Sequence, residues 1–169
     1  MRTSVATVLA FTTAIVMLGS GCASLHDKDS TKATDATLIP GDEAQLGKSF
    51  AETRTLDTSV SFEVVQFTYD SFIVPPTQVT KVEAVGKYLH DNPTRVVIVD
   101  GHCDERGSNE YNLSLGEQRA EAVRAYLINM DIAASRVQTR SFGKEKPLDT
   151  GHSEAAWAKN RRGEFAIYK

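Results

Sequence analysis

The run RVVIVDG, residues 95–101, limits the possible folds more than any other stretch of this chain. Its unbroken series of β-branched residues predicts a strand that is covered on both faces. Such strands are typical of sheets with packed helices, because neither face of the strand meets water. One covering helix is predicted just before the run, where apolar residues recur at near-helical spacing: Val79, Val82, Val85 and Leu89.

A second helix is predicted after the run. Its apolar stripe consists of Ala120, Val123 and Leu127, and it ends near residue 129. Ser114 and Glu117 match a capping box, which favours a helix that begins at Ser114. An earlier start at Ser108 is also open.

The remaining segments continue the alternation of strand and helix. Strands are expected in VSFEVVQFTY at 60–69, SRVQTRSFG at 135–143 and GEFAIYK at 163–169, with a short helix in SEAAWAKNR at 153–161. The order βαβαβαβ, without internal repeats, predicts a single two-layer α/β sandwich whose βαβ units contain parallel strand pairs.

The N-terminal residues 1–21 are typical of an export signal. Arg2 precedes an apolar run from Val5 to Leu18, which is shorter than the roughly 20 residues of a transmembrane helix. LGSGC then matches a bacterial lipobox, although Gly19 occupies a position that usually holds an aliphatic residue. We therefore expect lipidation at Cys22, with ordinary secretion as the alternative.

Residues 22–58 are expected to form a tether between the lipid and the folded domain. They are rich in Ser, Thr, Asp and Lys and poor in large apolar side chains, so they cannot bury a core of their own. Fully extended, such a segment spans roughly 110–130 Å. Export would favour a disulfide between Cys22 and Cys103, but a lipidated Cys22 has no free sulfur. Cys103 is then expected to be a small buried thiol.

Charge excludes one large class of partner. Acidic and basic residues are mixed along the chain and give a formal charge of −3. Because no strongly basic face follows from this balance, nucleic-acid binding is not expected.

The segment DGHCDERGSNEYNLSLGEQRA, residues 100–120, holds the residues most capable of chemistry. His102 and Cys103 are adjacent on an extended chain and point to opposite sides, which disfavours a nucleophile–base pair. The consecutive residues His102, Cys103 and Asp104 cannot all face one metal ion. Neither a cysteine active site nor a metal site is favoured.

Asp104 and Arg119 suggest a third possibility. Asp104 follows the buried strand, where open α/β sheets commonly hold ligands, and Arg119 lies early in the next helix. An acid and an arginine in one crevice suit a zwitterion, because the carboxylate binds an ammonium and the guanidinium binds a carboxylate. On spacing alone, it is at least as reasonable that the two pair with each other or face water. Asp70, after the first strand, is expected at the same edge of the sheet.

Three separated motifs carry a resemblance: VDGHCDERGSNEYNLSLGEQRAEAVRAYL, SFGKEKP and AWAKNRRGEF. Together they resemble the OmpA-like peptidoglycan-binding domain family, and within it the branch of peptidoglycan-associated lipoproteins. The resemblance spans the expected domain, 59–169, and implies a mixed four-stranded sheet with packed helices. It also implies a non-catalytic domain, without cofactor or metal, that binds the meso-diaminopimelate residue of the peptidoglycan stem peptide.

The resemblance assigns the site residues one motif at a time. Asp104 and Arg119 match the two principal ligand contacts. The loop after the first strand and the NRR element supply the others: Tyr69, Asp70, Ser71, Asn160 and Arg161. For Arg161 the alternative is a capping and bracing role, and Asn112 is expected to hold its loop. Cys103 replaces the family's usual threonine, so the loop at Asp104 is expected to be shaped differently.

The resemblance also implies a cellular setting. A lipid at Cys22 would anchor the chain in the outer membrane with its domain in the periplasm, and the soluble periplasmic Tol protein would be a partner in envelope integrity and cell division. Two alternatives stay open: an accessory module of another envelope assembly, and a cell-wall hydrolase that uses Cys103.

Overall fold

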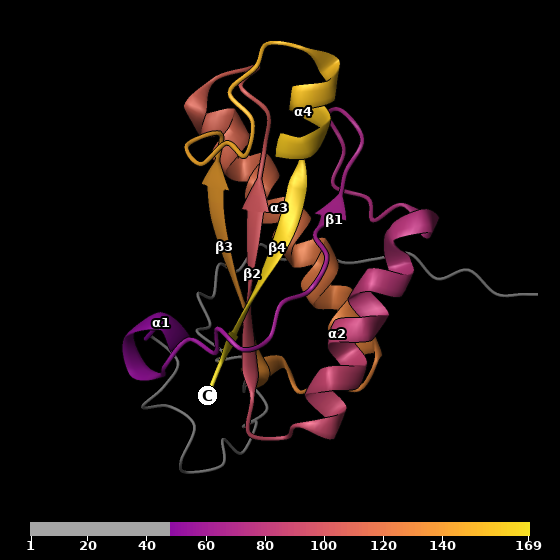
Figure 1. Cartoon of the computed structure of the whole chain (residues 1–169), viewed down its shortest axis with the longest axis vertical. Helices are drawn as coiled ribbons and strands as arrows, with labels where there is room; N and C mark the ends of the chain where they lie inside the picture. The colour runs from indigo at the N-terminus through magenta and orange to yellow at the C-terminus, as the bar shows by residue number, and fades with distance from the viewer. Residues whose placement is uncertain (1–47) are drawn as a thin grey trace, which may run out of the picture. The chain divides into compact units, whose positions relative to one another are not determined.

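The computed structural model describes residues 48–169 (Figure 1). The expected signal peptide, the lipidation site at Cys22 and most of the expected tether lie outside the described residues. Within 48–169 no helix is both long and apolar enough to cross a bilayer.

Helices and strands alternate along the described chain. In chain order they are α1 (Phe50–Thr53), β1 (Val65–Gln66), η2 (Pro76–Gln78), α2 (Val79–Asp91), β2 (Val96–His102), α3 (Asn109–Asn129), η3 (Ala134–Arg136), β3 (Val137–Gly143), α4 (Glu154–Asn160) and β4 (Arg162–Tyr168). The strands form one sheet in the order β1-β4-β2-β3. β2 and β3 are parallel, whereas β4 runs antiparallel to both β2 and β1. The predicted α/β sandwich with a mixed four-stranded sheet is confirmed.

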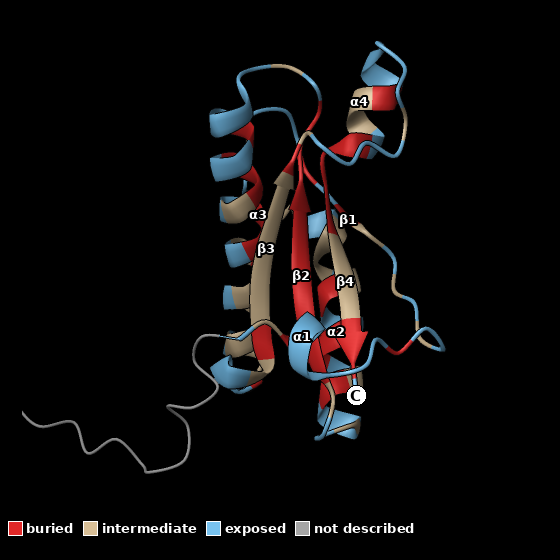
Figure 2. Ribbon diagram, turned by 90° about the vertical axis from the view of Figure 1, so that its left-hand side faces the viewer, coloured by how far each residue is buried: buried red, intermediate tan, exposed pale blue. Residues whose placement is uncertain are grey.

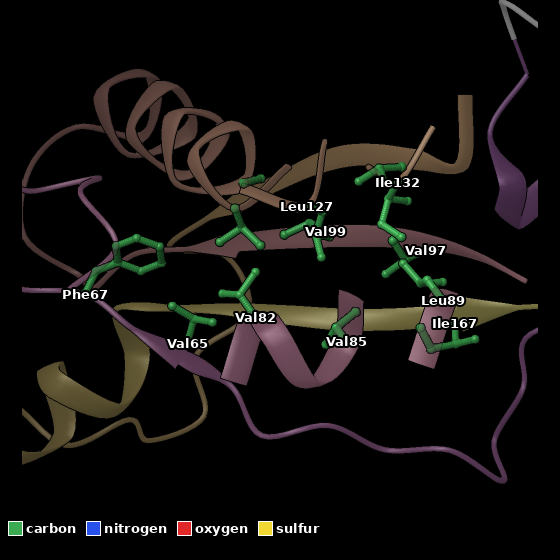
Figure 3. Close-up of a cluster of buried hydrophobic side chains, with 13 residues drawn as sticks. Val65, Phe67, Val82, Val85, Leu89, Val97, Val99, Leu127, Ile132 and Ile167 are labelled. Carbon is green, nitrogen blue, oxygen red and sulfur yellow. The ribbon is translucent and has the colours of Figure 1, made fainter. Parts of the chain in front are cut away.

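The main core lies between the sheet and the helices α2 and α3 (Figure 3). Every residue of β2 is buried, as Figure 2 shows in red, which confirms the strand predicted from RVVIVDG. Val97 and Val99 face the helices, and the alternating residues Val96 and Ile98 belong to a second cluster on the other face. Burial on both faces explains the unbroken apolar run.

α3 begins earlier than its capping box suggested. The hydroxyl of Ser108 accepts a hydrogen bond from the backbone of Tyr111, at 3.1 Å, and Ser108 is the N-cap. Ser114 lies within the helix, so the start predicted there is wrong and the earlier alternative is right. Gly107, with φ of +92°, makes the turn that brings Ser108 into capping position.

The first predicted strand is also shorter than expected. Only Val65–Gln66 pairs with β4, although the pattern predicted a strand over 60–69. Val60 and Phe62 pack on the core without joining the ladder. The alternation of apolar residues over 60–69 therefore indicates which side chains are buried, and does not indicate pairing with a neighbouring strand.

The folded unit includes residues that were expected in the tether. Phe50 is only 8% exposed and packs with Val96, Ile98 and Tyr168. The side chain of Gln138 holds the backbone at the start of α1, accepting from Phe50 N at 2.8 Å and donating to Lys48 O at 3.1 Å. We call residues 48–57 the strap. The strap covers an apolar patch on the face of the sheet opposite α2 and α3, so packing begins before the expected boundary near residue 58.

Candidate functional site

A pocket lies where β2 ends, between the loop after β1, the N-terminal turns of α3 and the end of α4. Its volume, including the space at its mouth that is open to solvent, is about 320 Å³. Five of the predicted site residues line it: Tyr69, Asp70, Asp104, Arg119 and Arg161. Ser71 and Asn160 are not among the lining residues. The topology thus brings together side chains that are up to 92 positions apart, from Tyr69 to Arg161.

Asp104 is 4% exposed, and its carboxylate is fully engaged. Oδ1 accepts hydrogen bonds from the backbone and Nε of Arg106, both at 3.1 Å. Oδ2 accepts from Nη2 of Arg106 at 2.6 Å and from Nη1 of Arg161 at 3.2 Å. Burial alone would raise the pKa of Asp104, but the hydrogen bonds from Arg106 and Arg161 hold it below its ordinary value. The carboxylate is therefore ionised at neutral pH.

Arg119 is fully buried beneath the same pocket. Its guanidinium donates to three backbone carbonyls: Ser71 at 2.8 Å, His102 at 2.8 Å and Thr68 at 3.2 Å. Nη1 also contacts Sγ of Cys103 at 3.3 Å. Four of its five N–H groups are thus used inside the protein, which leaves one on Nη2. Arg119 fixes the loop after β1 against the end of β2 and forms the floor of the site.

Among the described residues, Asp104 and Arg119 make no hydrogen bond or ion pair with each other, and neither simply faces water. Two further arginines neutralise Asp104, and backbone dipoles occupy most of Arg119. From the sequence, the carboxylate of Asp104 and the guanidinium of Arg119 are expected to be free to bind a zwitterion. In the ligand-free pocket both groups are instead occupied by contacts within the protein.

The loop after β1 supplies one rim of the pocket. Asp70 adopts a left-handed φ of +53°, and its carboxylate accepts a hydrogen bond from the hydroxyl of Tyr111. Tyr69 is exposed and its ring lies against Arg106. The hydroxyl of Ser71 accepts from the backbone of Ile73 at 3.2 Å, so its side chain shapes its own loop while its carbonyl holds Arg119.

Asn160 and Arg161 of the NRR element make different kinds of contact. Arg161 points into the pocket, where it bridges Asp104 and Glu154, the latter at 2.6 Å. The side chain of Asn160 accepts from the backbones of Leu148 and Asp149, at 2.8 and 3.0 Å, and braces the loop before α4. In the ligand-free pocket the side chain of Asn160 therefore contacts its neighbouring loop, whereas Arg161 both braces the pocket and lines it.

Arg106 was missing from the predicted set, although it makes more contacts to Asp104 than any other residue. Its guanidinium carbon lies 4.1 Å from the ring centroids of both Tyr69 and Trp157. The sequence carried a usable signal, because an aspartate commonly accepts a hydrogen bond from the backbone two residues on, and here that residue is Arg106. The contribution of Trp157 had no such signal, since α4 is distant in sequence.

His102 and Cys103 point to opposite sides of β2, as their adjacency predicted. His102 stacks on Phe142, and both of its ring nitrogens lack a hydrogen-bond partner within the described residues. Burial, together with the charge of Arg162, lowers the pKa of His102 to about 4. Cys103 donates to the carbonyl of Asn112 at 3.3 Å, and burial raises the pKa of its thiol. Within 48–169 no cluster of three potential metal ligands occurs.

Comparison with known proteins identifies the family of the chain that forms this pocket. The model of the OmpA family matches residues 66–161, which include all of the pocket-lining residues. The chain belongs to the OmpA family. Its resemblance to that family, predicted from the sequence motifs, is therefore confirmed.

Within the OmpA family the chain is similar to proteins named peptidoglycan-associated lipoprotein. That of Pasteurella multocida is 38% identical, over 80% of this chain and 98% of the relative. That of Pseudomonas aeruginosa is 36% identical, over 86% and 87%. The crystal structure of the peptidoglycan-associated lipoprotein from Burkholderia pseudomallei superimposes with a TM-score of 0.61 at 38% identity, covering 64% of this chain and 91% of that one. These matches extend beyond the family model toward the N-terminus.

Proposed function

We propose that this protein binds peptidoglycan without cleaving it, and that the pocket at the end of β2 holds the meso-diaminopimelate residue of the stem peptide. The observation that carries the proposal is the ionised, buried Asp104 in one pocket with the guanidinium groups of Arg106, Arg119 and Arg161. The names of the relatives point to peptidoglycan as the larger ligand.

The chemistry of the pocket suits the free end of meso-diaminopimelate. That end carries one ammonium and one carboxylate on the same carbon. A buried carboxylate offers the ammonium a charge-assisted hydrogen bond, and an arginine offers the carboxylate a bidentate one. Asp70 at the rim adds a second acidic group for the ammonium.

The strap supports a tethering role. It contacts the sheet at Val96 and Ile98, the beginning of β2, whereas the pocket lies beyond His102 at the end of that strand. Figure 1 shows α1 and α4 near opposite ends of the sheet. A chain that leaves through the strap can therefore lead away from the wall-binding face. Many copies that bind one continuous wall would act together through high effective concentration.

We place the protein in the bacterial cell envelope, and propose an outer-membrane anchor through a lipid at Cys22. Residues 1–21 would be removed as a signal peptide, and residues 23–47 would span the gap. The soluble periplasmic Tol protein is the proposed protein partner. A hydrolase that uses Cys103 is not favoured, because its thiol is buried, carries a raised pKa and makes no hydrogen bond to His102.

The proposal is tested by co-sedimentation of the full-length protein, in mild detergent, with intact labelled peptidoglycan. The parent is expected to sediment with the wall, to be released by free meso-diaminopimelate, and to liberate no soluble fragments. Asp104→Asn keeps the shape and removes the charge, so binding should fall by at least about tenfold.

A matched control exists on the other side of the sheet. Asp100 is 7% exposed and forms a bidentate pair with Arg140, at 2.8 and 2.8 Å, outside the pocket. Asp100→Asn should bind peptidoglycan like the parent. If Asp104→Asn also binds like the parent while both variants are folded, the assigned site is wrong. Steady release of fragments would instead favour the hydrolase.

A further inference from the structure

Two aromatic rings and two carboxylates contact the guanidinium of Arg106. Its central carbon lies 4.1 Å from the ring centroids of both Tyr69 and Trp157, a cation–π contact with each. Nε and Nη2, which form one edge of the group, bind Asp104, and Nη2 also lies 3.8 Å from Oε2 of Glu154. The backbone of Arg106 also donates to Asp104, so the carboxylate closes a local turn.

Asp104 has no acceptor position left for a ligand. Each of its oxygens accepts two hydrogen bonds, which is the ordinary capacity of a carboxylate oxygen. The bonds from Arg161 and from the backbone of Arg106 belong to groups held by other contacts. Arg161 is 6% exposed and also binds Phe67 O and Glu154. The side chain of Arg106 is 30% exposed and is the partner that can give way.

We propose that Arg106 determines the specificity of the pocket through an exchange of ion pairs. This inference rests on the proposed function. The ammonium of the incoming ligand replaces the side chain of Arg106 on Asp104, and the released edge of Arg106 binds the carboxylate of the same ligand. The contacts with Tyr69 and Trp157 hold the guanidinium beside Asp104, so the exchange needs only a short movement of Arg106.

The exchange favours a zwitterion over a simple ammonium. A stem peptide with meso-diaminopimelate replaces one ion pair by two, so both Asp104 and Arg106 remain paired. A stem peptide with L-lysine, which has the ammonium alone, would leave Arg106 with Glu154 as its only anion. The side chain of Glu154 is 64% exposed, lies 3.8 Å from Nη2 of Arg106 and already pairs with Arg161. Such an exposed pair contributes little, so the lysine peptide is bound less well.

The test compares two tripeptides, L-Ala-γ-D-Glu-meso-diaminopimelate and L-Ala-γ-D-Glu-L-Lys, for binding to the full-length protein in detergent. The parent should prefer the first by at least about tenfold. Arg106→Gln removes the competitor and the carboxylate contact together, so that preference should shrink to less than about threefold. Arg106→Lys retains the positive charge but cannot form two parallel hydrogen bonds to a carboxylate. Its preference for the diaminopimelate peptide should lie between those of the parent and Arg106→Gln.

The protein itself supplies a fluorescent reporter of Arg106 and a matched control variant. Trp157 is the single tryptophan of the sequence, so its fluorescence reports directly on the guanidinium that lies over it. The emission should change with the diaminopimelate peptide in the parent, and this change should be absent in Arg106→Gln. Arg140→Gln is the matched control, since Arg140 also pairs with a buried aspartate and lies 4.6 Å from an aromatic ring centroid, that of Phe142.

The results of this test distinguish failure of the proposed function from failure of the ion-pair exchange. A parent that binds neither tripeptide nor peptidoglycan overturns the proposed function and the exchange with it. A parent that prefers the diaminopimelate peptide, with a preference unchanged in folded Arg106→Gln, overturns the exchange alone. A reduced preference in Arg106→Gln with an unaltered preference in Arg140→Gln supports the exchange.

Discussion

Gly101 and Gly116 touch where α3 crosses β2. A methyl group added to Gly101 would lie 1.9 Å from the carbonyl oxygen of Gly116. This close approach places the next turn of the helix, and with it Arg119, directly under the end of β2. Two glycines therefore set the distance between the helix and the strand that carry the floor of the site.

Gly101→Ala is expected to destabilise the domain by about 3 kcal/mol or more, because backbone cannot move aside as a side chain would. Chemical denaturation measures the loss. Gly163→Ala is the control: its added methyl group would meet nothing closer than 3.6 Å, and we expect a change below about 1 kcal/mol. Equal destabilisation of the two variants would contradict the contact.

Arg119→Ala should lower stability by about 2–4 kcal/mol, since three backbone carbonyls lose their donor. Arg136 offers a comparison, because its guanidinium likewise binds three carbonyls, those of Leu89, Asn92 and Arg95. Arg136→Ala should cost a similar amount, measured by urea denaturation. At low temperature, where both variants are folded, only Arg119→Ala should lose peptidoglycan binding. Equal binding by both would show that Arg119 has no part in the site.

Cys103→Thr should retain both the fold and the site. A threonine hydroxyl can donate to Asn112 O and accept from Arg119 as the thiol does, so stability should stay within about 1 kcal/mol of the parent. Cys103→Val fills similar space without a hydrogen-bonding group and should cost about 1–2 kcal/mol. Thermal unfolding distinguishes them. If the valine variant is the more stable, the thiol acts only as an apolar side chain.

His102 gives the domain a pH-dependent stability. Its pKa is about 4 in the folded state and near 6.5 when unfolded, so between these values the unfolded chain binds more protons. Stability from His102 is complete above about pH 6.5 and is lost as the pH falls through 4, by about 3 kcal/mol in total. Denaturation curves at pH 4.5 and 7 should show this loss, and His102→Gln should reduce it. An unchanged loss in His102→Gln would assign the effect to other groups.

Periodic burial and strand ends are local properties, so the sequence predicted the strands and placed Asp104 and Arg119 at one edge of the sheet. The mixed sheet and most other candidate site residues followed from the resemblance to the OmpA-like family. RVVIVDG became a strand buried on both faces, and Asp104 and Arg119 reached one pocket. Contacts between distant segments were not predictable in this way. Trp157 meets Arg106 only because β3 and α4 return the chain to the same edge. The strap was missed because Phe50 is its only residue in the buried cluster, and its bonds to Gln138 join positions far apart in the sequence.

The most direct measurement is a crystal structure of this protein with the tripeptide L-Ala-γ-D-Glu-meso-diaminopimelate. Our account predicts the side-chain ammonium within hydrogen-bonding distance of Asp104, and the adjacent carboxylate on a guanidinium of the same pocket. A tripeptide bound elsewhere, with Asp104 still held by Arg106 and Arg161 as in the ligand-free chain, would contradict it.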